Sequence, residues 1–256
     1  MHLSQQDLFI SIVTLSIISA VLSYFAVYKK WLTPMGALAA SMMAFVFYFT
    51  GGYKAFIAPG VFFVVGSLLS KLNKPQKEKE GRNAKQVFAN GITGMLFMLL
   101  YGATLHDTYL YAALVSFCIS MADSTSSELG VYFKGTVYDI LSFKRMPVGV
   151  SGGISLQGTV AGLAGAAILS LTIFYAYELS FATFLWITLA GFIGMIADSI
   201  LGSWLQAKYK TAYGTITDDA IPGAQKIRGF SWCTNDAVNI ISNILVTLLF
   251  FFIFKQ

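Results

Sequence analysis

Eight apolar stretches divide the chain, and most of them are long enough to cross a lipid bilayer. A helix crossing a hydrocarbon core of about 30 Å needs roughly 20 mainly apolar residues. The second and third stretches are short, so seven helices is the alternative count. The sequence predicts an all-α polytopic transmembrane bundle that forms a single domain over residues 1–256. The predicted helices are Leu8–Tyr28, Pro34–Thr50, Ala55–Leu69, Val87–Leu105, Tyr109–Gly130, Ile154–Tyr175, Phe181–Leu205 and Ala237–Phe254.

The composition supports a membrane location. Hydrophobic residues make up 56% of the chain and charged residues only 11%, with a mean hydropathy of +0.69. These values exclude a soluble domain of this length. The first stretch has no basic segment before it and is followed by Lys29-Lys30 instead of a small-residue cleavage site. We therefore expect it to remain as a helix, not to be removed as a signal peptide.

The basic residues predict an orientation in the membrane. Of the 17 lysines and arginines, 15 fall in alternate loops, and only Lys54 and Lys255 fall on the other side. Because basic residues concentrate in cytoplasmic loops, both termini are predicted to lie outside. The predicted cytoplasmic segments are the basic segment 71–85 and two loops with functional residues, 131–153 and 206–235.

Four carboxylates lie within or at the edges of the apolar stretches, at Asp123, Glu128, Asp198 and Asp236. A charged group inside a membrane span costs a few kcal/mol, so such residues usually line a polar cavity and serve a function. Two of them share a local phrase, Ala122-Asp123-Ser124 and Ala197-Asp198-Ser199. From the predicted orientation and a rise of about 1.5 Å per residue, all four lie at one depth near the cytoplasmic interface.

Four negative groups at one depth would repel one another unless they are protonated or neutralised by a cation. An all-oxygen set with few protein ligands favours Mg²⁺, which typically binds one or two carboxylates together with waters and phosphate oxygens. Asp123 and Glu128 are five residues apart, about 140° around an ideal helix. They share a metal only if the helix is distorted or a second helix completes the site. Asp236 has the alternative role of a helix cap.

A glycine-rich turn follows the basic pair Lys144-Arg145 and leads directly into a predicted helix. Glycines allow backbone N–H groups to approach phosphate oxygens, and a helix N-terminus adds a favourable dipole. The spacing is not that of a Walker A motif. We expect this segment to bind phosphate through Lys144, Arg145, Gly149, Ser151, Gly152, Gly153 and Ser155.

Amide side chains form a third group, with Gln206 near the end of the seventh helix and a stripe on the eighth. Asn235, Asn239 and Asn243 recur every four residues, which places them on one helix face. Hydrogen bonds between helices would explain this stripe. Recognition of a nucleotide or of a substrate headgroup is the alternative.

These phrases together resemble a family of integral membrane proteins that includes the plant phytyl-phosphate kinase of tocopherol synthesis and vertebrate transmembrane protein nineteen. The resemblance covers most of the chain from about residue 30. It is carried by Glu80-Gly81-Arg82 with Gln86 and Asn90-Gly91, by Ala122 through Gly130, by Gly149 through Gly158, by Gly191 through Gly194, by Asp198 through Gly202, and by Asn235 through Asn239. The usual aromatic residue of the second phrase is replaced by serine here.

The resemblance implies a kinase that converts an isoprenyl monophosphate to the diphosphate, using CTP or another nucleoside triphosphate with Mg²⁺. In that activity, Asp123, Glu128 and Asp198 would bind the metal, and Arg82 would contact the acceptor phosphate. A lipid phosphate keeps its chain in the bilayer and its headgroup at the interface, which is the depth predicted for the acids. The headgroup would then be bound by Asn90, Gln206, Asn235, Asp236 and Asn239.

The same residues are compatible with two other functions. Paired acids in a helical bundle also describe a cation-coupled transporter, and the layout is analogous to that of a lipid cytidylyltransferase. A transporter requires acids near the midplane that are accessible from both faces. We expect the lipid bilayer as a partner and no nucleic acid. A homo-oligomer is compatible with the sequence, which does not set the oligomeric state.

Overall fold

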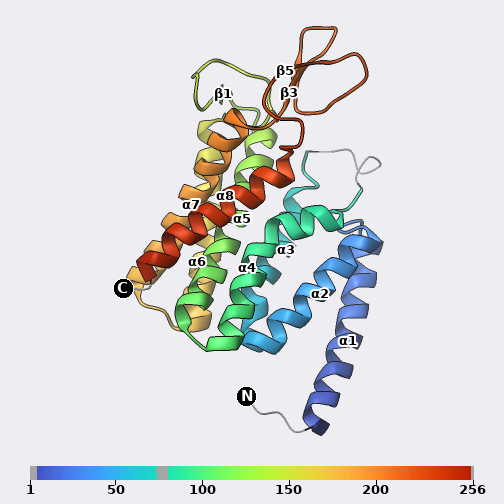
Figure 1. Cartoon of the computed structure of the whole chain (residues 1–256), viewed down its shortest axis with the longest axis vertical. Coiled ribbons are helices and arrows are strands. Elements are labelled where there is room, and N and C mark those ends of the chain that lie inside the picture. The colour runs from blue at the N-terminus through green and yellow to red at the C-terminus, as the bar shows by residue number, and fades with distance from the viewer. Residues whose placement is uncertain (1–4, 74–79, 255–256) are drawn as a thin grey trace.

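The computed structural model describes residues 5–73 and 80–254, and these residues form eight α-helices (Figure 1). The all-α prediction and the count of eight are confirmed. A short 3-10 turn, Tyr53–Phe56, precedes the third helix. The helices are α1 (Gln5–Tyr28), α2 (Pro34–Gly51), α3 (Ile57–Leu69), α4 (Ala84–Thr104), α5 (Asp107–Tyr132), α6 (Leu156–Tyr177), α7 (Phe181–Trp204) and α8 (Asn235–Phe254). Residues 74–79 of the predicted basic segment, with Lys74, Lys77 and Lys79, lie outside the described residues.

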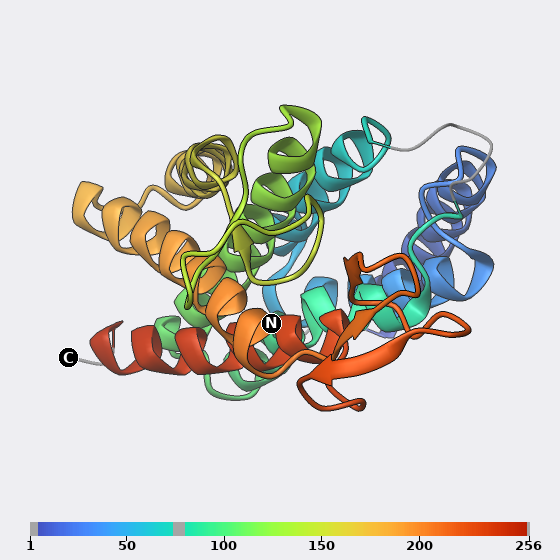
Figure 2. The ribbon, with the colours of Figure 1, turned by 90° about the horizontal axis from the view of Figure 1, so that it is seen from above.

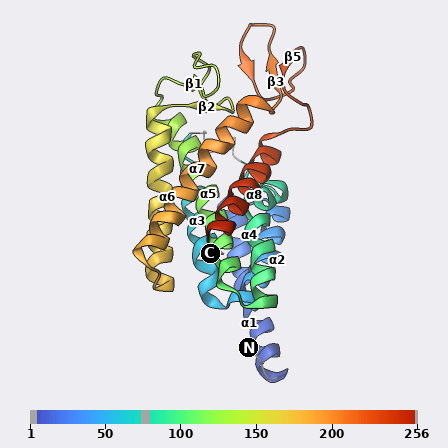
Figure 3. The same cartoon turned by 60° about the vertical axis from the view of Figure 1, so that its left-hand side comes forward.

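Successive helices alternate in direction, so the long connections after α5 and α7 lie at the same end of the bundle (Figure 3). These connections were predicted as loops, but they contain five short strands. The strands are β1 (Tyr138–Asp139), β2 (Gly153–Ile154), β3 (Lys208–Lys210), β4 (Ile216–Thr217) and β5 (Gln225–Arg228). Strands of two to four residues are too short to show an alternating pattern in the sequence.

The strands form two small antiparallel sheets. β1 pairs with β2, with Tyr138 opposite Ile154, and the second sheet has the order β4-β3-β5. Figure 2 looks down on this end of the molecule and shows the segment with β1 and β2 beside the end of α5, and the second sheet beside the start of α8. The two sheets therefore cover the end of the bundle where the predicted site residues lie.

Helix α5 occupies the centre of the bundle, where it contacts α3, α4, α6, α7 and α8. Its middle is fully buried, for example at Ala112, Val115, Cys118 and Ala122. Six of the other helices, α1, α2, α4, α6, α7 and α8, are long and apolar enough to cross a membrane. Because protein surrounds α5, this helix can carry polar residues that a lipid-facing helix could not.

Candidate functional site

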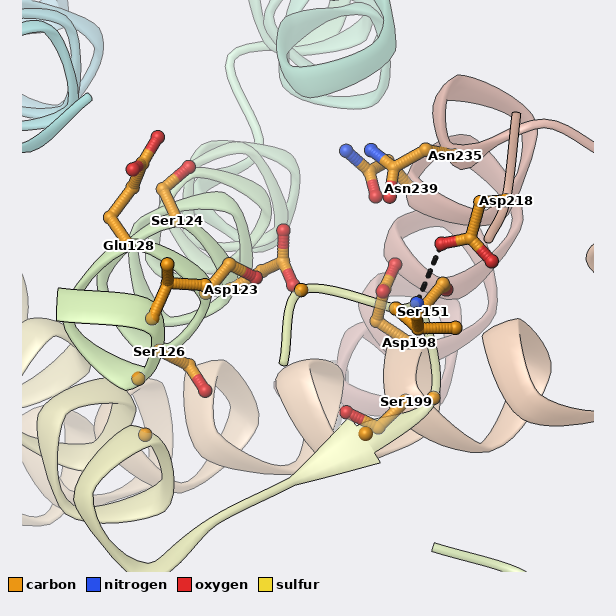
Figure 4. Close-up of a pocket in the computed structure, with 18 of the residues that line it drawn as sticks. Asp123, Ser124, Ser126, Glu128, Ser151, Asp198, Ser199, Asp218, Asn235 and Asn239 are labelled. Carbon is orange, nitrogen blue, oxygen red and sulfur yellow. Dashed lines mark hydrogen bonds between the residues drawn. The ribbon is translucent and has the colours of Figure 1, made fainter. Parts of the chain in front are cut away.

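A polar cavity of about 350 Å³ opens at the end of the bundle that carries the strands. Its walls come from α4, α5, α7 and α8, from the first turn of α6, from the segment between β1 and β2, and from the loop after β4. This volume is within the range of small-molecule binding sites. Figure 4 shows the side chains that face it, most of them carboxylates, amides and hydroxyls.

Both copies of the Ala-Asp-Ser phrase face this cavity. Asp123 and Ser124 line it from α5, and Asp198 and Ser199 line it from α7 (Figure 4). α8 orients Asp198, because Ser242 Oγ donates to its Oδ2 at 2.9 Å. In its satisfied orientation, the amide of Asn239 donates to the same oxygen at 3.1 Å. The structure thus brings two carboxylates from two helices to one cavity and leaves further oxygen lone pairs facing it.

Close packing of small residues fixes the direction in which Asp123 points. α6 presents Gly158 and Gly162 to α5, and a Cβ at either position would lie 3.0–3.1 Å from a carbonyl oxygen of α5. The hydroxyl of Thr125 in α5 donates to the backbone carbonyls of Met121 and Ala122, at 2.8 and 3.0 Å. The two glycines, four residues apart, therefore allow α6 to pack closely against α5. Because α6 packs against one face of the α5 segment 123–127, the face that carries Asp123 is turned to the cavity.

The glycine-rich turn rests on the end of α7. Gly152 has a φ of +80°, and a Cβ at this position would lie 2.5 Å from backbone atoms of Ser203. Gly202 in turn leaves room for the side chain of Ser151. Asp198 and Gly202 are four residues apart and therefore lie on one helix face. The segment Asp198 through Gly202 thus supplies a carboxylate to the cavity and also packs against the glycine-rich turn.

A buried ion pair holds the same turn from the other side. Lys208 of β3, 2% exposed, contacts Asp218 Oδ1 at 2.8 Å and also donates to the carbonyl of Ser151. Asp218 Oδ2 accepts from the backbone N–H of Ser151 at 2.7 Å. Burial lowers the pKa of Lys208, and the nearby Asp218 opposes that shift. The turn is therefore pinned at Ser151 by a lysine and an aspartate 57 and 67 residues further along the chain.

Asp139 of β1 joins the two sheets to α7. Its Oδ2 accepts from Ser203 Oγ at 2.7 Å and from Arg228 of β5 at 3.0 Å, while Oδ1 accepts from the N–H and the hydroxyl of Ser142. Burial acts to raise the pKa of Asp139, but these hydrogen bonds outweigh it and the pKa is lowered below its usual range. The carboxylate therefore stays charged at neutral pH and connects the elements that close the cavity end.

Arg82 lies at the edge of the cavity nearest α3. Its guanidinium fills the space beside Gly66 of α3 and lies over the ring of Phe62, with Cζ 5.4 Å from the ring centroid. Burial lowers the pKa of Arg82, and the charge of Glu128 opposes this shift. Just after Arg82, Asn83 and Gln86 form a reciprocal capping box that begins α4. The Arg82 position is thus fixed by the start of a helix.

Glu128 interacts with the connection that follows α3. Asn73 Nδ2 donates to its Oε2 at 2.8 Å and to its backbone carbonyl at 2.6 Å. In Figure 4 its carboxylate points in a different direction from that of Asp123, as a five-residue spacing on a helix requires. Both residues line the cavity, but from different sides of α5.

The start of α8 completes the wall with Asn235, Asp236 and Asn239. The first turn is capped by Thr234, whose hydroxyl accepts from Ala237 N at 3.4 Å, and Asp236 lines the cavity. Further along α8, Asn243 donates to the Ser116 carbonyl and to Ser120 Oγ of α5, at 2.9 and 3.0 Å. The amide stripe therefore divides into a cavity end and an end that bonds one helix to another.

Carboxylates outnumber cations in the wall of the cavity. Among its described lining residues, five are carboxylates, Asp123, Glu128, Asp198, Asp218 and Asp236, and Arg82 is the one cation. Within the described part of the chain, no three side chains of metal-binding type are grouped closely enough to hold an ion by themselves. This arrangement fits Mg²⁺ that arrives with phosphate oxygens, because such an ion needs only one or two protein carboxylates.

Most of the predicted site residues lie together in this cavity. Lys144 and Arg145 are exposed in the segment between β1 and β2 and do not line it. Gln206 is buried at the end of α7, where its backbone pairs with Phe230, and it does not line the cavity either. The lining residues that the sequence predicted are Arg82, Asn90, Asp123, Glu128, Gly149, Ser151, Gly152, Gly153, Ser155, Asp198, Asn235, Asp236 and Asn239.

The turn contributes fewer free amides than its glycines suggest. Ser151 N donates to Asp218, and Gly153 N donates to the carbonyl of Val150 at 3.2 Å. Ser155 Oγ accepts from Gly158 N at 3.1 Å and caps α6. These groups are therefore engaged within the protein, and of the features predicted to bind phosphate the dipole at the N-terminus of α6 stays available.

A family profile described as "Integral membrane protein DUF92" matches residues 17–247. The chain belongs to this family. The match includes all eight helices, at least in part, and every residue that lines the cavity. No solved structure matches the chain at a significant level.

Several curated proteins are similar over most of the chain. An uncharacterized membrane protein of Synechocystis is 26% identical over 85% of this chain and 80% of its own length. Protein PGR of Arabidopsis thaliana is 28% identical over 91% of this chain and 92% of its own length. The chloroplastic Protein VTE6 of Arabidopsis thaliana is 27% identical over 82% of this chain, and the match spans 62% of that protein.

Proposed function

We propose that this protein transfers a phosphoryl group from CTP or another nucleoside triphosphate to an isoprenyl monophosphate, giving the isoprenyl diphosphate in a Mg²⁺-dependent reaction. The observation that carries the proposal is the shared cavity, whose wall contains Asp123, Asp198, the Ser151 turn and Arg82. The resemblance to the family of the plant phytyl-phosphate kinase supports the choice of acceptor. The site would face the cytoplasm, where soluble nucleotide is available.

Phosphoryl transfer asks a protein mainly for positioning and for neutralisation of charge. Asp123 and Asp198 would bind Mg²⁺, which would bring the β- and γ-phosphates of the nucleotide into an otherwise acidic cavity. Glu128, which already accepts from Asn73, would act at the metal through water or through Arg82. The acceptor is a phosphate that is already ionised at neutral pH, so the reaction needs little general-base help.

Arg82 would hold the acceptor phosphate. It is the one cation among the described lining residues, and its guanidinium is planar and suited to bidentate contact with phosphate oxygens. Asn90, Asn235 and Asn239 would donate or accept hydrogen bonds at the headgroup from α4 and α8. The oxygen of the acceptor phosphate attacks the γ-phosphorus, the bond from that phosphorus to the β-phosphate oxygen breaks, and the nucleoside diphosphate leaves.

The position of the cavity supports an enzyme over a transporter. It lies at one end of the bundle, beneath two small sheets, and part of its wall consists of loop residues such as Val148 and Asp218. A transporter would need its acids near the midplane and accessible from both faces.

The test is a transfer assay with purified protein in detergent. Each of the four γ-labelled nucleoside triphosphates is incubated with Mg²⁺ and a panel of isoprenyl monophosphates. We expect labelled diphosphate from the wild type. Asp123→Asn and Asp198→Asn should each lower kcat/KM by about 100-fold or more, because even residues that only orient a metal ligand are worth about 10- to 100-fold.

The matched control is Asp107→Asn, an acid at the opposite end of α5 that does not line the cavity. This variant should retain the wild-type rate. If no combination of donor and acceptor gives a labelled product, or if all three variants behave alike, the assignment fails.

A further inference from the structure

A second cavity, about 560 Å³ in volume, lies between α1, α2, α3 and α4. Its wall is mainly apolar, with residues such as Leu22, Met43, Phe47 and Phe63. We call this cavity the apolar groove. It is separate from the acidic cavity in composition, because acids dominate the first and the described residues that line the groove include no carboxylate.

The groove and the acidic cavity meet at three residues. Arg82, Gln86 and Asn90 line both of them. Arg82 forms the junction physically, since its guanidinium lies over the ring of Phe62, which is itself a groove residue. One end of the groove is therefore cationic and polar, and it opens toward the proposed site of phosphoryl transfer.

The groove is long and runs along the helices. On α1 its lining residues extend from Ala26 back to Ser11, a separation of 15 residues or about 22 Å. On α3 it includes Gly60, six residues before the Gly66 that contacts Arg82, and therefore about 9 Å further along that helix. An extended chain fits this shape better than a compact ligand.

Helix α1 forms one wall of the groove and is attached to α2 by hydroxyl groups. Ser41 of α2 is hydrogen bonded to Ser19 and Ser23 of α1, at 2.8 and 3.0 Å, and Tyr48 donates to Ser11 at 3.4 Å. The hydroxyl groups are therefore hydrogen bonded to one another. The groove keeps an apolar interior although several serines line it.

We propose that the apolar groove binds the isoprenoid chain of one prenyl monophosphate, with its phosphate at Arg82 and its tail along α1 and α3. The inference rests on the proposed function and adds a binding site for the chain. A single apolar groove that ends at a single guanidinium matches a single-chain amphiphile with a terminal phosphate. The chain is thus held inside the protein, not in the surrounding lipid, and the length of the groove limits which chains are accepted.

Gly60 provides a sharp test. A Cβ at Gly60 meets no heavy atom within 4 Å, so a large side chain there extends into open space of the groove. Gly60→Trp should block the groove about 9 Å from Gly66, on the side away from Arg82. The matched control is Val64→Trp, one helical turn further along α3, because Val64 is 43% exposed and does not line the groove.

The assay compares acceptors of two and four isoprene units. We expect Gly60→Trp to lower kcat/KM for the four-unit acceptor by about tenfold or more, as is typical for a filled apolar pocket, and to leave the two-unit acceptor unchanged. Val64→Trp should match the wild type with both acceptors. Equal losses with both chain lengths, or equal effects of both variants, would overturn the groove as the chain site.

A second measurement does not depend on activity. A four-unit prenyl monophosphate with a photoreactive diazirine at the end of its chain is crosslinked to the purified protein, and the labelled peptides are mapped. Labelling of the α1 and α3 peptides that disappears in Gly60→Trp and with excess unlabelled prenyl monophosphate supports the proposal. Labelling of other peptides refutes the proposal. It is also refuted if a photoreactive phospholipid labels the groove and excess prenyl monophosphate does not displace it. If the transfer assay fails but this labelling succeeds, the proposed function is wrong and the chain site stands.

Discussion

The ion pair between Lys208 and Asp218 gives a prediction that can be worked from the geometry. The two side chains are 2.8 Å apart, with exposed fractions of 2% and 19%. Lys208 also donates to the carbonyl of Ser151, and Asp218 accepts from the N–H of the same residue. Replacing Lys208 by Met keeps the apolar stem, but it leaves the carboxylate without its cation and the carbonyl without its donor.

The expected magnitude follows from burial. A hydrogen bond to a charged group contributes about 1.5–3 kcal/mol, and removing one partner of a fully buried pair costs about 3–5 kcal/mol. Because Asp218 is partly exposed, water compensates some of this loss. We therefore expect Lys208→Met to lower the free energy of unfolding by about 3 kcal/mol, and the coupling between the two residues to be about 1.5–2 kcal/mol.

A double-mutant cycle measures this coupling. Lys208→Met, Asp218→Asn and the double variant are unfolded in mixed micelles by titration with a denaturing detergent, and the free energies are compared with the wild type. The double variant should be more stable than the sum of the two single losses implies. If the losses add to within about 0.5 kcal/mol, as for independent sites, the pair does not pin the turn and the reasoning is wrong.

Two further predictions concern the elements that close the cavity end. Gly152→Ala should lower stability by about 2–5 kcal/mol, because a left-handed conformation costs about 1–2 kcal/mol outside glycine and overpacking against Ser203 adds about 1–3 kcal/mol. Gly149→Ala, with a similar φ but a nearest side-chain atom 3.9 Å away, should show only the first cost in the same unfolding titration. Asp139→Asn should destabilise the protein by about 2 kcal/mol at neutral pH. Since the folded pKa of Asp139 is lowered, its stabilisation is present above about pH 4 and is lost progressively as the pH falls further. The unfolding midpoints of wild type and variant should therefore approach each other as the pH falls below about 4. A difference in midpoint that does not change with pH would contradict a role for the ionised carboxylate.

The helices could be predicted from the sequence because the bilayer imposes their length. Each predicted helix overlaps the observed one closely, as in Phe181–Leu205 against Phe181–Trp204. The convergence of Asp123 and Asp198 could also be predicted, because two helices of the same direction place equivalent positions at the same depth. The central position of α5 could not be predicted from the sequence. Five other helices surround α5, and contacts between helices far apart in the chain leave no mark in its hydropathy.

The residues that sequence reasoning missed are those whose partners lie far along the chain. Asp139 contacts Ser203 and Arg228, 64 and 89 residues away, and no periodicity or motif marks such a pair. Lys208 resembled an ordinary loop cation, although it is buried. Conversely, Lys144 and Arg145 were assigned to phosphate because they precede the glycine turn. The turn between β1 and β2 keeps them exposed, so nearness in sequence did not become nearness in space.

The most direct test of the central claim is to identify both products of the wild-type reaction. The purified protein is incubated with a nucleoside triphosphate carrying ¹⁸O in its γ-phosphate, Mg²⁺ and an isoprenyl monophosphate, and the products are analysed by mass spectrometry. With the label in the non-bridging oxygens, phosphoryl transfer in the acidic cavity predicts an isoprenyl diphosphate with the label in its terminal phosphate. The nucleoside diphosphate should be unlabelled. Release of labelled pyrophosphate with a nucleotide attached to the lipid, or an unchanged lipid, would contradict the account.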